Sequence, residues 1–172
     1  MKLKFKNSTS VLRNYRLIIA IILFHITSNL LAQTESSQNS EILVSTISEL
    51  NSAITSAKPG NIIIMKDGIW KNATINLNSK ANASFPIILR AQTPGKVVLC
   101  GNSTLTFSAP YLVVDGLIFK NGYIESGSVI TFQSDNCRLT NTIIKDYNPA
   151  NFQTAYYWVY FQGSYNRMDH CL

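Results

Sequence analysis

STLTFSAPYLVVDGLIFKNG, residues 103–122, is the stretch that decides the fold. It contains three short apolar runs, at 105–107, 112–114 and 117–119, and the last two are separated by Asp115-Gly116. Each run is too short for a helix and has the length of a strand bounded by turn residues. The stretch therefore predicts three short strands joined by tight corners.

The same pattern recurs twice further along the chain. Without gaps, residues 105–120 align on residues 130–145, which align on residues 159–172, at offsets of 25 and 29 residues. Two core-type positions recur in every copy: an aromatic one with Phe107, Phe132 and Phe161, and an aliphatic one with Val114, Leu139 and Met168. Repetition at this period, with several strands per unit, is typical of a solenoid. We expect an all-β parallel β-helix.

Ahead of the repeat, the sequence predicts one amphipathic helix. Thr46-Ile47-Ser48-Glu49 has the form of a capping box, and Lys58-Pro59-Gly60 ends the helical pattern. The apolar positions recur at helical spacing, at Ile47, Leu50, Ile54 and Ala57. A solenoid has an open apolar end that must be covered, so we expect this helix to cap the first coil. Between the helix and the repeat, Thr93-Pro94-Gly95-Lys96 predicts a type II turn.

Residues 1–32 predict a secretory signal peptide. Five basic residues precede an unbroken apolar run at 17–24, and the small Ala32 precedes a polar stretch. The apolar run is short for a membrane span, although an uncleaved anchor is the alternative. We therefore expect a flexible N-terminus at 33–40, β-helix coils over 41–172, a secreted or periplasmic location, and no membrane contact after cleavage.

The net charge argues against nucleic acid as a partner. The chain carries a formal +6, but the predicted signal peptide contributes five basic residues and no acid, which leaves about +1. A nucleic-acid-binding domain would need a basic stripe on its folded surface. The three cysteines, Cys100, Cys137 and Cys171, are too few for a disulfide framework and lack zinc-ligand spacing, so we expect buried free thiols.

The repeat places four cations in two pairs on neighbouring coils. Lys120 aligns with Lys145, and Arg138 aligns with Arg167. Adjacent rungs of a parallel sheet lie about 4.8 Å apart, so each pair presents two cations to one face. Arginine suits bidentate binding of a carboxylate, and these four residues are candidates for binding an acidic polysaccharide. The alternative is ordinary solvated surface charge.

Other polar and aromatic residues are weaker candidates. Asp115 and Asp169 share a repeat position two rungs apart, about 10 Å by the rung spacing, which is wide for a pair of glycosidase acids. Asp115 is better explained by a corner. In the insertion at 147–158, Tyr156, Tyr157 and Trp158 suit sugar stacking, but we expect them to pack in the core. His170 is interpreted as structural.

Four segments taken in order carry a resemblance to a known family. They are KPGNIIIMKDGIW (58–70), FPIILRAQTPGKVVLCGN (85–102), YLVVDGLIFKNG (111–122) and FQGSYNRMDHC (161–171). Residues 41–172 thereby resemble the start of the chondroitinase B and alginate lyase group, the family 6 polysaccharide lyases. The resemblance implies a right-handed parallel β-helix, secretion from a bacterium, and cleavage of an acidic polysaccharide by β-elimination.

The resemblance also implies what this chain lacks. Lyases of the family use Ca²⁺ to neutralise the uronate carboxylate, a lysine as the base and an arginine near the leaving oxygen, all on coils after the segment Gly163–Arg167. No catalytic residue and no metal ligand is therefore assigned here. We expect an N-terminal portion of a longer protein that is inactive alone. The alternatives are a non-catalytic glycan-binding or structural β-helix and, less favoured, a β-helical glycoside hydrolase.

Overall fold

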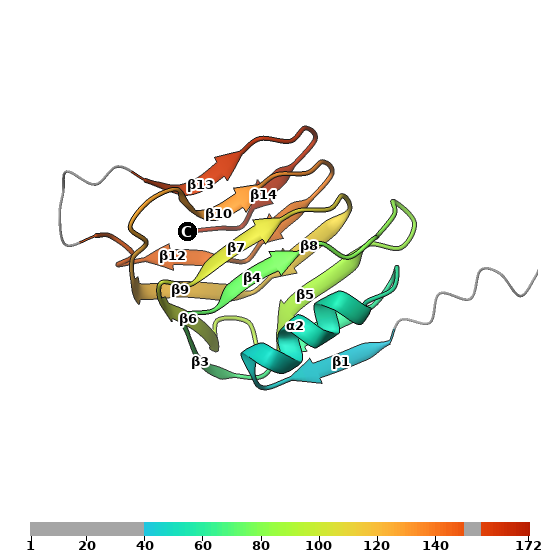
Figure 1. Cartoon of the computed structure of the whole chain (residues 1–172), viewed down its shortest axis with the longest axis horizontal. Coiled ribbons are helices and arrows are strands. Elements are labelled where there is room, and N and C mark those ends of the chain that lie inside the picture. The colour runs from blue at the N-terminus through green and yellow to red at the C-terminus, as the bar shows by residue number, and fades with distance from the viewer. Residues whose placement is uncertain (1–39, 150–155) are drawn as a thin grey trace, which may run out of the picture. The chain divides into compact units, whose positions relative to one another are not determined.

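Three parallel sheets are built from strands that recur once per coil (Figure 1). Sheet A contains, in spatial order, β1 (Glu41–Val44), β2 (Ile62–Met65), β5 (Ile87–Ala91), β8 (Leu112–Asp115), β11 (Arg138–Thr140) and β14 (Arg167–Asp169). Sheet B contains β3 (Gly68–Lys71), β6 (Val97–Gly101), β9 (Leu117–Gly122) and β12 (Ile143–Lys145). Sheet C contains β4 (Thr74–Leu77), β7 (Thr104–Phe107), β10 (Ser128–Phe132) and β13 (Tyr157–Phe161).

This arrangement, seen in a computed structural model that describes residues 40–149 and 156–172, confirms the predicted parallel β-helix. The predicted signal peptide at 1–32 lies outside the described residues. So does the predicted flexible N-terminus at 33–40, except for its last residue, and so does the middle of the insertion.

The repeat alignment gives the strand register directly. In sheet C, Phe132 pairs with Phe107 on one side and with Phe161 on the other. The three rings stack with centroids 4.3 Å and 4.4 Å apart and nearly parallel planes. In sheet A, Leu139 pairs with Val114 and with Met168, which confirms the second repeat position. Side chains alternate along each strand, so these positions point inward and fill the core of the solenoid.

Helix α2 (Ile47–Ser56) covers the N-terminal end of the core, beside β1 (Figure 1). Its buried residues are Leu50, Ala53 and Ile54, and the carbonyl of Ile54 accepts a 2.5 Å hydrogen bond from the Ser79 hydroxyl. The predicted cap is thus confirmed. At ten residues, this helix, the only one in the described ranges, is too short and too polar to be a membrane span.

The capping box of α2 forms on one side only. The Glu49 amide donates to Thr46 Oγ1 at 3.1 Å, as the motif predicts. The Glu49 carboxylate instead accepts from the amide of Ser45 at 2.7 Å and from the Ser45 hydroxyl at 2.9 Å, one residue before the predicted partner. These bonds, first the one from the Ser45 amide, lower the pKa of Glu49. The strongest bonds of the Glu49 carboxylate therefore go to the residue before the N-cap.

The corners of the coils rest on left-handed backbone conformations. Gly116 has φ +78°, which confirms Asp115-Gly116 as a corner, and a Cβ at this glycine would lie 3.2 Å from Pro94 Cα. At the predicted turn, Lys96 N donates to Thr93 O at 3.0 Å and Gly95 has φ +75°. These values match the predicted turn, which needs positive φ at its third residue.

All three cysteines are free thiols, as expected. Only Cys137 is buried, where burial raises the pKa of its thiol, whereas Cys100 and Cys171 are partly exposed. The expectation of full burial is thus right for one cysteine and wrong for two.

Candidate functional site

The outer face of sheet A carries two columns of residues that run from coil to coil. In the first column, Val113 pairs with Arg138 and Arg138 with Arg167. In the second, Thr140 pairs with Asp115 on one side and with Asp169 on the other. The predicted register of the arginine pair is therefore confirmed, and polar groups gather on the last two rungs of this face.

A single carboxylate joins both arginines. Asp169 accepts from Arg138 Nε at 3.1 Å and Nη2 at 3.0 Å, and it forms an ion pair with Arg167 Nε. Thr140 Oγ1 donates to Asp169 Oδ1 at 2.5 Å, and His170 Nδ1 lies 3.2 Å from the same oxygen. The two cations thus do not face solvent as an isolated pair, because Asp169 binds one edge of each.

These bonds set the charge state of the cluster. The hydrogen bonds from Arg138, followed by that from Thr140, hold the pKa of Asp169 well below its ordinary value. The hydrogen bonding between Arg138 and Asp169 also raises the pKa of Arg138. The carboxylate of Asp169 and the guanidinium of Arg138 are therefore held in their charged forms. The bonded cluster holds two arginines and one aspartate, and Asp115 is a further acid close enough to act on Arg138. His170, interpreted from sequence as structural, contacts this cluster.

The second predicted pair lies elsewhere. Lys145 pairs with Lys120 between β12 and β9, so the register is again confirmed. This pair belongs to sheet B, whereas Arg138 and Arg167 belong to sheet A. The structure therefore brings the four predicted binding residues together as two separate pairs and not as one site.

The two aspartates at one repeat position have separate partners. Asp169 is bound to two arginines, and Asp115 accepts a 2.8 Å hydrogen bond from Asn141 Nδ2. Thr140 lies between them in register. Glycosidase chemistry needs two carboxyl groups flanking one bond, one of them protonated at working pH. This arrangement does not supply such a pair.

The sequence interpretation missed Tyr147, which anchors the insertion. This side chain is fully buried, and its hydroxyl lies 2.8 Å from the carbonyl oxygens of both Gly101 and Ser103. Burial raises the pKa of Tyr147 to about 12. The Tyr147 carbonyl oxygen accepts from the hydroxyl of Tyr156 and, at 2.9 Å, from Trp158 Nε1. Tyr147 thus bonds both to the coil before the insertion and to the two aromatic residues that follow it.

The three aromatic residues after the insertion behave differently from one another. Tyr156 packs against the core, as predicted. Tyr157 does not, since it is 62% exposed. The core prediction is therefore wrong for Tyr157, whereas Trp158 is 41% exposed and lines an apolar pocket at the end of the core. Their strand, β13, lies at the edge of sheet C and has no neighbour on its outer side among the described residues.

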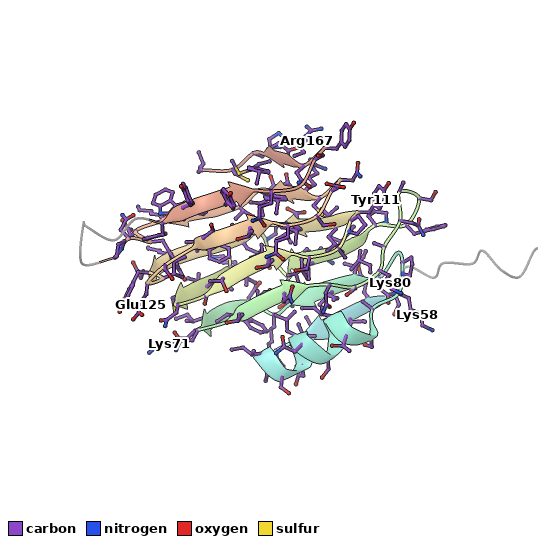
Figure 2. All side chains as sticks on the ribbon, turned by 45° about the horizontal axis from the view of Figure 1, so that its top comes forward. Lys58, Lys71, Lys80, Tyr111, Glu125 and Arg167 are labelled. Carbon is purple, nitrogen blue, oxygen red and sulfur yellow. The ribbon has the colours of Figure 1, made fainter. Side chains whose placement is uncertain are left out.

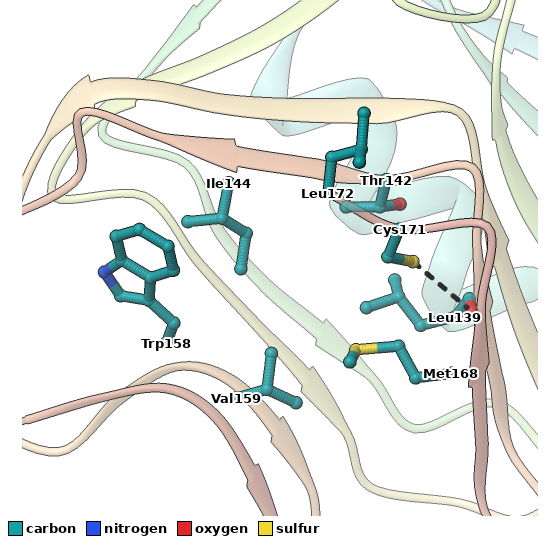
Figure 3. A pocket seen from close by; sticks show the side chains of 8 residues that line it. All are labelled: Leu139, Thr142, Ile144, Trp158, Val159, Met168, Cys171 and Leu172. Atoms are coloured by element: carbon teal, nitrogen blue, oxygen red, sulfur yellow. Dashed lines mark hydrogen bonds between the residues drawn. The ribbon is translucent and has the colours of Figure 1, made fainter.

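The core is open at the end of the stack that is remote from α2. An apolar pocket of about 130 Å³ lies at this end, and Figure 3 shows the side chains that line it. It is lined by Leu139, Thr142, Ile144, Trp158, Val159, Met168, Cys171 and Leu172. Met168, an inward-facing residue, is still 47% exposed. The sulfur of Cys171 lies 3.8 Å from the carbonyl of Leu139 at the rim. This surface has the character of a core cross-section.

No group of three or more histidine, cysteine or acidic side chains in the described ranges could hold a metal ion. The carboxylates of Asp115 and Asp169 on this face are bonded to an amide and to arginines. Calcium prefers six to eight oxygen ligands, and this face does not offer them. The described residues therefore do not fit the calcium ion that the family resemblance implies.

A comparison with protein families decides the affiliation. A sequence model of the chondroitinase B family matches residues 44–172. The chain belongs to the chondroitinase B family. The resemblance inferred from the four ordered segments is thereby confirmed, and the match spans all coils of the β-helix from the end of β1 onward.

Solved structures of family 6 polysaccharide lyases are similar to this chondroitinase B family member. A lyase from Pseudopedobacter saltans is 54% identical, with a TM-score of 0.73 over 74% of this chain and 30% of that one. The alginate lyase AlyGC is 35% identical, with a TM-score of 0.75 over 77% of this chain and 19% of that one. A mannuronic-acid-specific lyase from human gut microbiota is 26% identical, with a TM-score of 0.68 over 77% and 33%.

The chain thus spans between about a fifth and a third of the length of these lyases. No curated protein matches it.

Proposed function

We propose that this chain forms the N-terminal coils of a secreted bacterial lyase that cleaves a uronate-containing polysaccharide by β-elimination. The observation that carries the proposal is the family match over residues 44–172. The 54% identity to a family 6 lyase supports it. Alginate is one proposed substrate, since one similar structure is an alginate lyase and another is a mannuronic-acid-specific lyase. Chondroitin or dermatan sulfate is the other, since the matching family model is that of chondroitinase B.

The chemistry of β-elimination defines what these coils supply and what they leave to others. A base must remove a proton next to a carboxylate, and the negative charge that develops must be stabilised. The described residues offer a scaffold and two arginines beside Asp169. Asp169 itself is a poor base, because it accepts hydrogen bonds from Arg138 and Thr140 and forms an ion pair with Arg167. We therefore place the lysine base, the arginine near the leaving oxygen and any calcium ligands on further coils of the same solenoid.

The open end of the core supports this placement. Phe161 and Met168 occupy inward-facing repeat positions and remain 44% and 47% exposed. In the preceding coil the same positions, Phe132 and Leu139, are at most 1% exposed. A further coil stacked on this end would bury the pocket of Figure 3, and burial of apolar surface is the main stabilising term in such repeats.

Two measurements test the proposal. Reading the coding sequence after codon 172 should reveal further coils with a lysine and an arginine on one face. The protein that includes those coils should convert alginate or chondroitin sulfate to an unsaturated uronate, which is followed by its ultraviolet absorbance, while the 172-residue chain should not. Cleavage by the short chain would contradict the placement of the base. A genuine stop after codon 172 would contradict the lyase proposal.

The second candidate is a non-catalytic β-helix that binds an acidic glycan. The observation that favours it is the cationic cluster of Arg138, Arg167 and Asp169, which needs no further coil to bind a carboxylate. Retention of the chain on immobilised alginate, without any cleavage by the protein encoded by the complete reading frame, would favour this candidate. For the location, the predicted signal peptide should direct the expressed protein to the periplasm or medium, which cell fractionation measures.

A further inference from the structure

One corner column of the solenoid holds tyrosines in a backbone conformation that tyrosine rarely adopts. Between sheets C and A, successive coils place Tyr111, Asn136 and Tyr165 at the same position, with φ of +60°, +56° and +58°. Asparagine and glycine are common at such angles, whereas a bulky residue there is an outlier. The left-handed backbone itself belongs to the fold, because all three coils share it. The tyrosine side chains at two of the three positions do not follow from that requirement.

The ring of Tyr165 gains little from the fold in return. Tyr165 is 88% exposed, the highest value among the large hydrophobic residues of the described ranges. The corner is nevertheless fixed on both sides of it. Ser164 N donates to Asp135 Oδ1 at 2.6 Å, and Asn166 bonds to Ser134 O at 2.9 Å and to the amide of Cys137 at 2.8 Å. A strained and exposed aromatic residue on a rigid corner points to a binding role.

The arginine column runs directly beside these tyrosines. Tyr165 lies two residues before Arg167, and Tyr111 lies two residues before Val113, which is in register with Arg138 and Arg167. The side chains of Arg138 and Arg167 are 43% and 67% exposed. Asp169 occupies Nε and Nη2 of Arg138 and Nε of Arg167. Within the described ranges, the remaining guanidinium nitrogens have no protein partner, so they are free to bind an anion.

The same corner carries further positive charge toward the N-terminal end. Figure 2 shows Lys58, Lys80 and Tyr111 along one side of the solenoid, with Arg167 further up the stack and Lys71 and Glu125 on the opposite side. Lys58 follows α2, and Lys80 lies in the loop between β4 and β5, which is the C-to-A corner of its coil. In the segments between sheets C and A, residues 78–86, 108–111, 133–137 and 162–166, the only acid is Asp135, which accepts from the amide of Ser164. Glu49 lies on the segment that holds Lys58.

We propose that this corner is a binding track for an acidic polysaccharide, with Tyr165 and Tyr111 stacking on sugar rings and Arg167 and Arg138 binding uronate carboxylates. The two tyrosines are two rungs apart, about 10 Å, so a chain lying along the solenoid axis passes both. Tyr111 is only partly exposed, so Tyr165 offers the larger stacking surface. Tyrosine combines a flat apolar ring with low conformational entropy, and arginine binds carboxylates through two parallel hydrogen bonds. The choice of a uronate polymer among polyanions rests on the proposed function.

The sharpest test replaces Tyr165 by the residue that the preceding coil uses. Tyr165→Asn keeps a residue that tolerates positive φ, as Asn136 does, and removes only the ring. In the full chain we expect an unchanged or higher Tm and an affinity for alginate oligosaccharide that falls roughly threefold to tenfold. Tyr123→Asn is the matched control, because Tyr123 is 45% exposed and follows β9, outside this corner. Its affinity should equal that of the unchanged chain.

Ligand controls separate the contributions of ring and charge. Arg167→Gln should weaken alginate binding and reduce its salt dependence, whereas a neutral cellulose oligosaccharide should bind weakly to every variant. Equal affinity of Tyr165→Asn and the unchanged chain would overturn the proposal, and so would equal binding of the neutral oligosaccharide. Cleavage is measured separately: alginate binding without cleavage by the longer protein would count against the lyase alone. Cleavage with an unaffected Tyr165→Asn variant would count against the track alone.

Discussion

Removing the ring of Phe132 should destabilise the β-helix more than removing the ring of Phe161. Phe132 is fully buried, and it stacks on Phe107 at 4.3 Å and on Phe161 at 4.4 Å. A buried Phe→Ala change costs about 3–5 kcal/mol through lost transfer energy and a residual cavity. Each of the two stacked pairs adds about 0.5–1.5 kcal/mol, so Phe132→Ala should cost about 4–8 kcal/mol. Phe161→Ala removes one pair from a ring that is 44% exposed, and should cost about 1–2 kcal/mol.

Urea unfolding of the unchanged chain, Phe132→Ala and Phe161→Ala, followed by circular dichroism, measures these differences in the free energy of unfolding. Because domains are stable by only about 5–15 kcal/mol, Phe132→Ala is expected to lie near its unfolding midpoint without denaturant. Phe132→Leu keeps most of the apolar side-chain volume and should cost about 1–2 kcal/mol, so a folded variant remains for comparison. An equal cost for Phe132→Ala and Phe161→Ala would refute the reasoning, because it would mean that the ring at the open end is as well packed as the central one.

Three further changes have defined outcomes. The pKa of Asp169 is lowered in the folded chain, so its contribution to stability is present above its unfolded value of about 4 and is lost as pH falls below it; Asp169→Asn should therefore flatten the dependence of Tm on acid pH. Tyr147→Phe removes the hydroxyl that bonds to the carbonyls of Gly101 and Ser103, although Gly101 O keeps its bond from the amide of Tyr123, and the change should cost about 1–3 kcal/mol in urea unfolding. A loss below the error of the measurement would contradict a structural role for the hydroxyl. Thr46→Ala removes the cap of α2 and should lower stability by about 1 kcal/mol, with Thr46→Ser as the control that keeps it.

The sequence predicts the fold well because a solenoid repeats one local solution. The offsets of 25 and 29 residues place Phe132 on Phe107 and Phe161 on Phe132, and the observed register is the same. In a parallel sheet, side chains alternate with a period of two, so one aligned position determines which face every other residue of the strand occupies. The arginine and lysine pairs follow from the same alignment.

The contacts that give the candidate site its character could not be read in this way. Arg138 bonds to Asp169, a residue 31 positions away that lies diagonally across the rung, and the choice of this partner depends on side-chain conformations. The repeat places Asp169 opposite Thr140 and so gives no reason to expect the bond. Tyr147 is a similar case, since its burial depends on the space left beside Gly122, where a Cβ would lie 2.5 Å from the ring. Exposure of Tyr157 reflects an edge position that the pattern alone does not mark.

The carbonyl oxygen of Tyr147 has a consequence for how this scaffold can diversify. Tyr156 and Trp158 both donate to that one oxygen. These bonds hold the coils before and after the insertion in place, whatever the number of residues between Tyr147 and Tyr156. Once two ends are pinned, doubling the length of a connecting segment costs only about 0.6 kcal/mol of loop entropy. Insertions of different length and sequence can therefore replace one another here without changes in the sheets. New binding specificities can arise at this position while the scaffold stays the same.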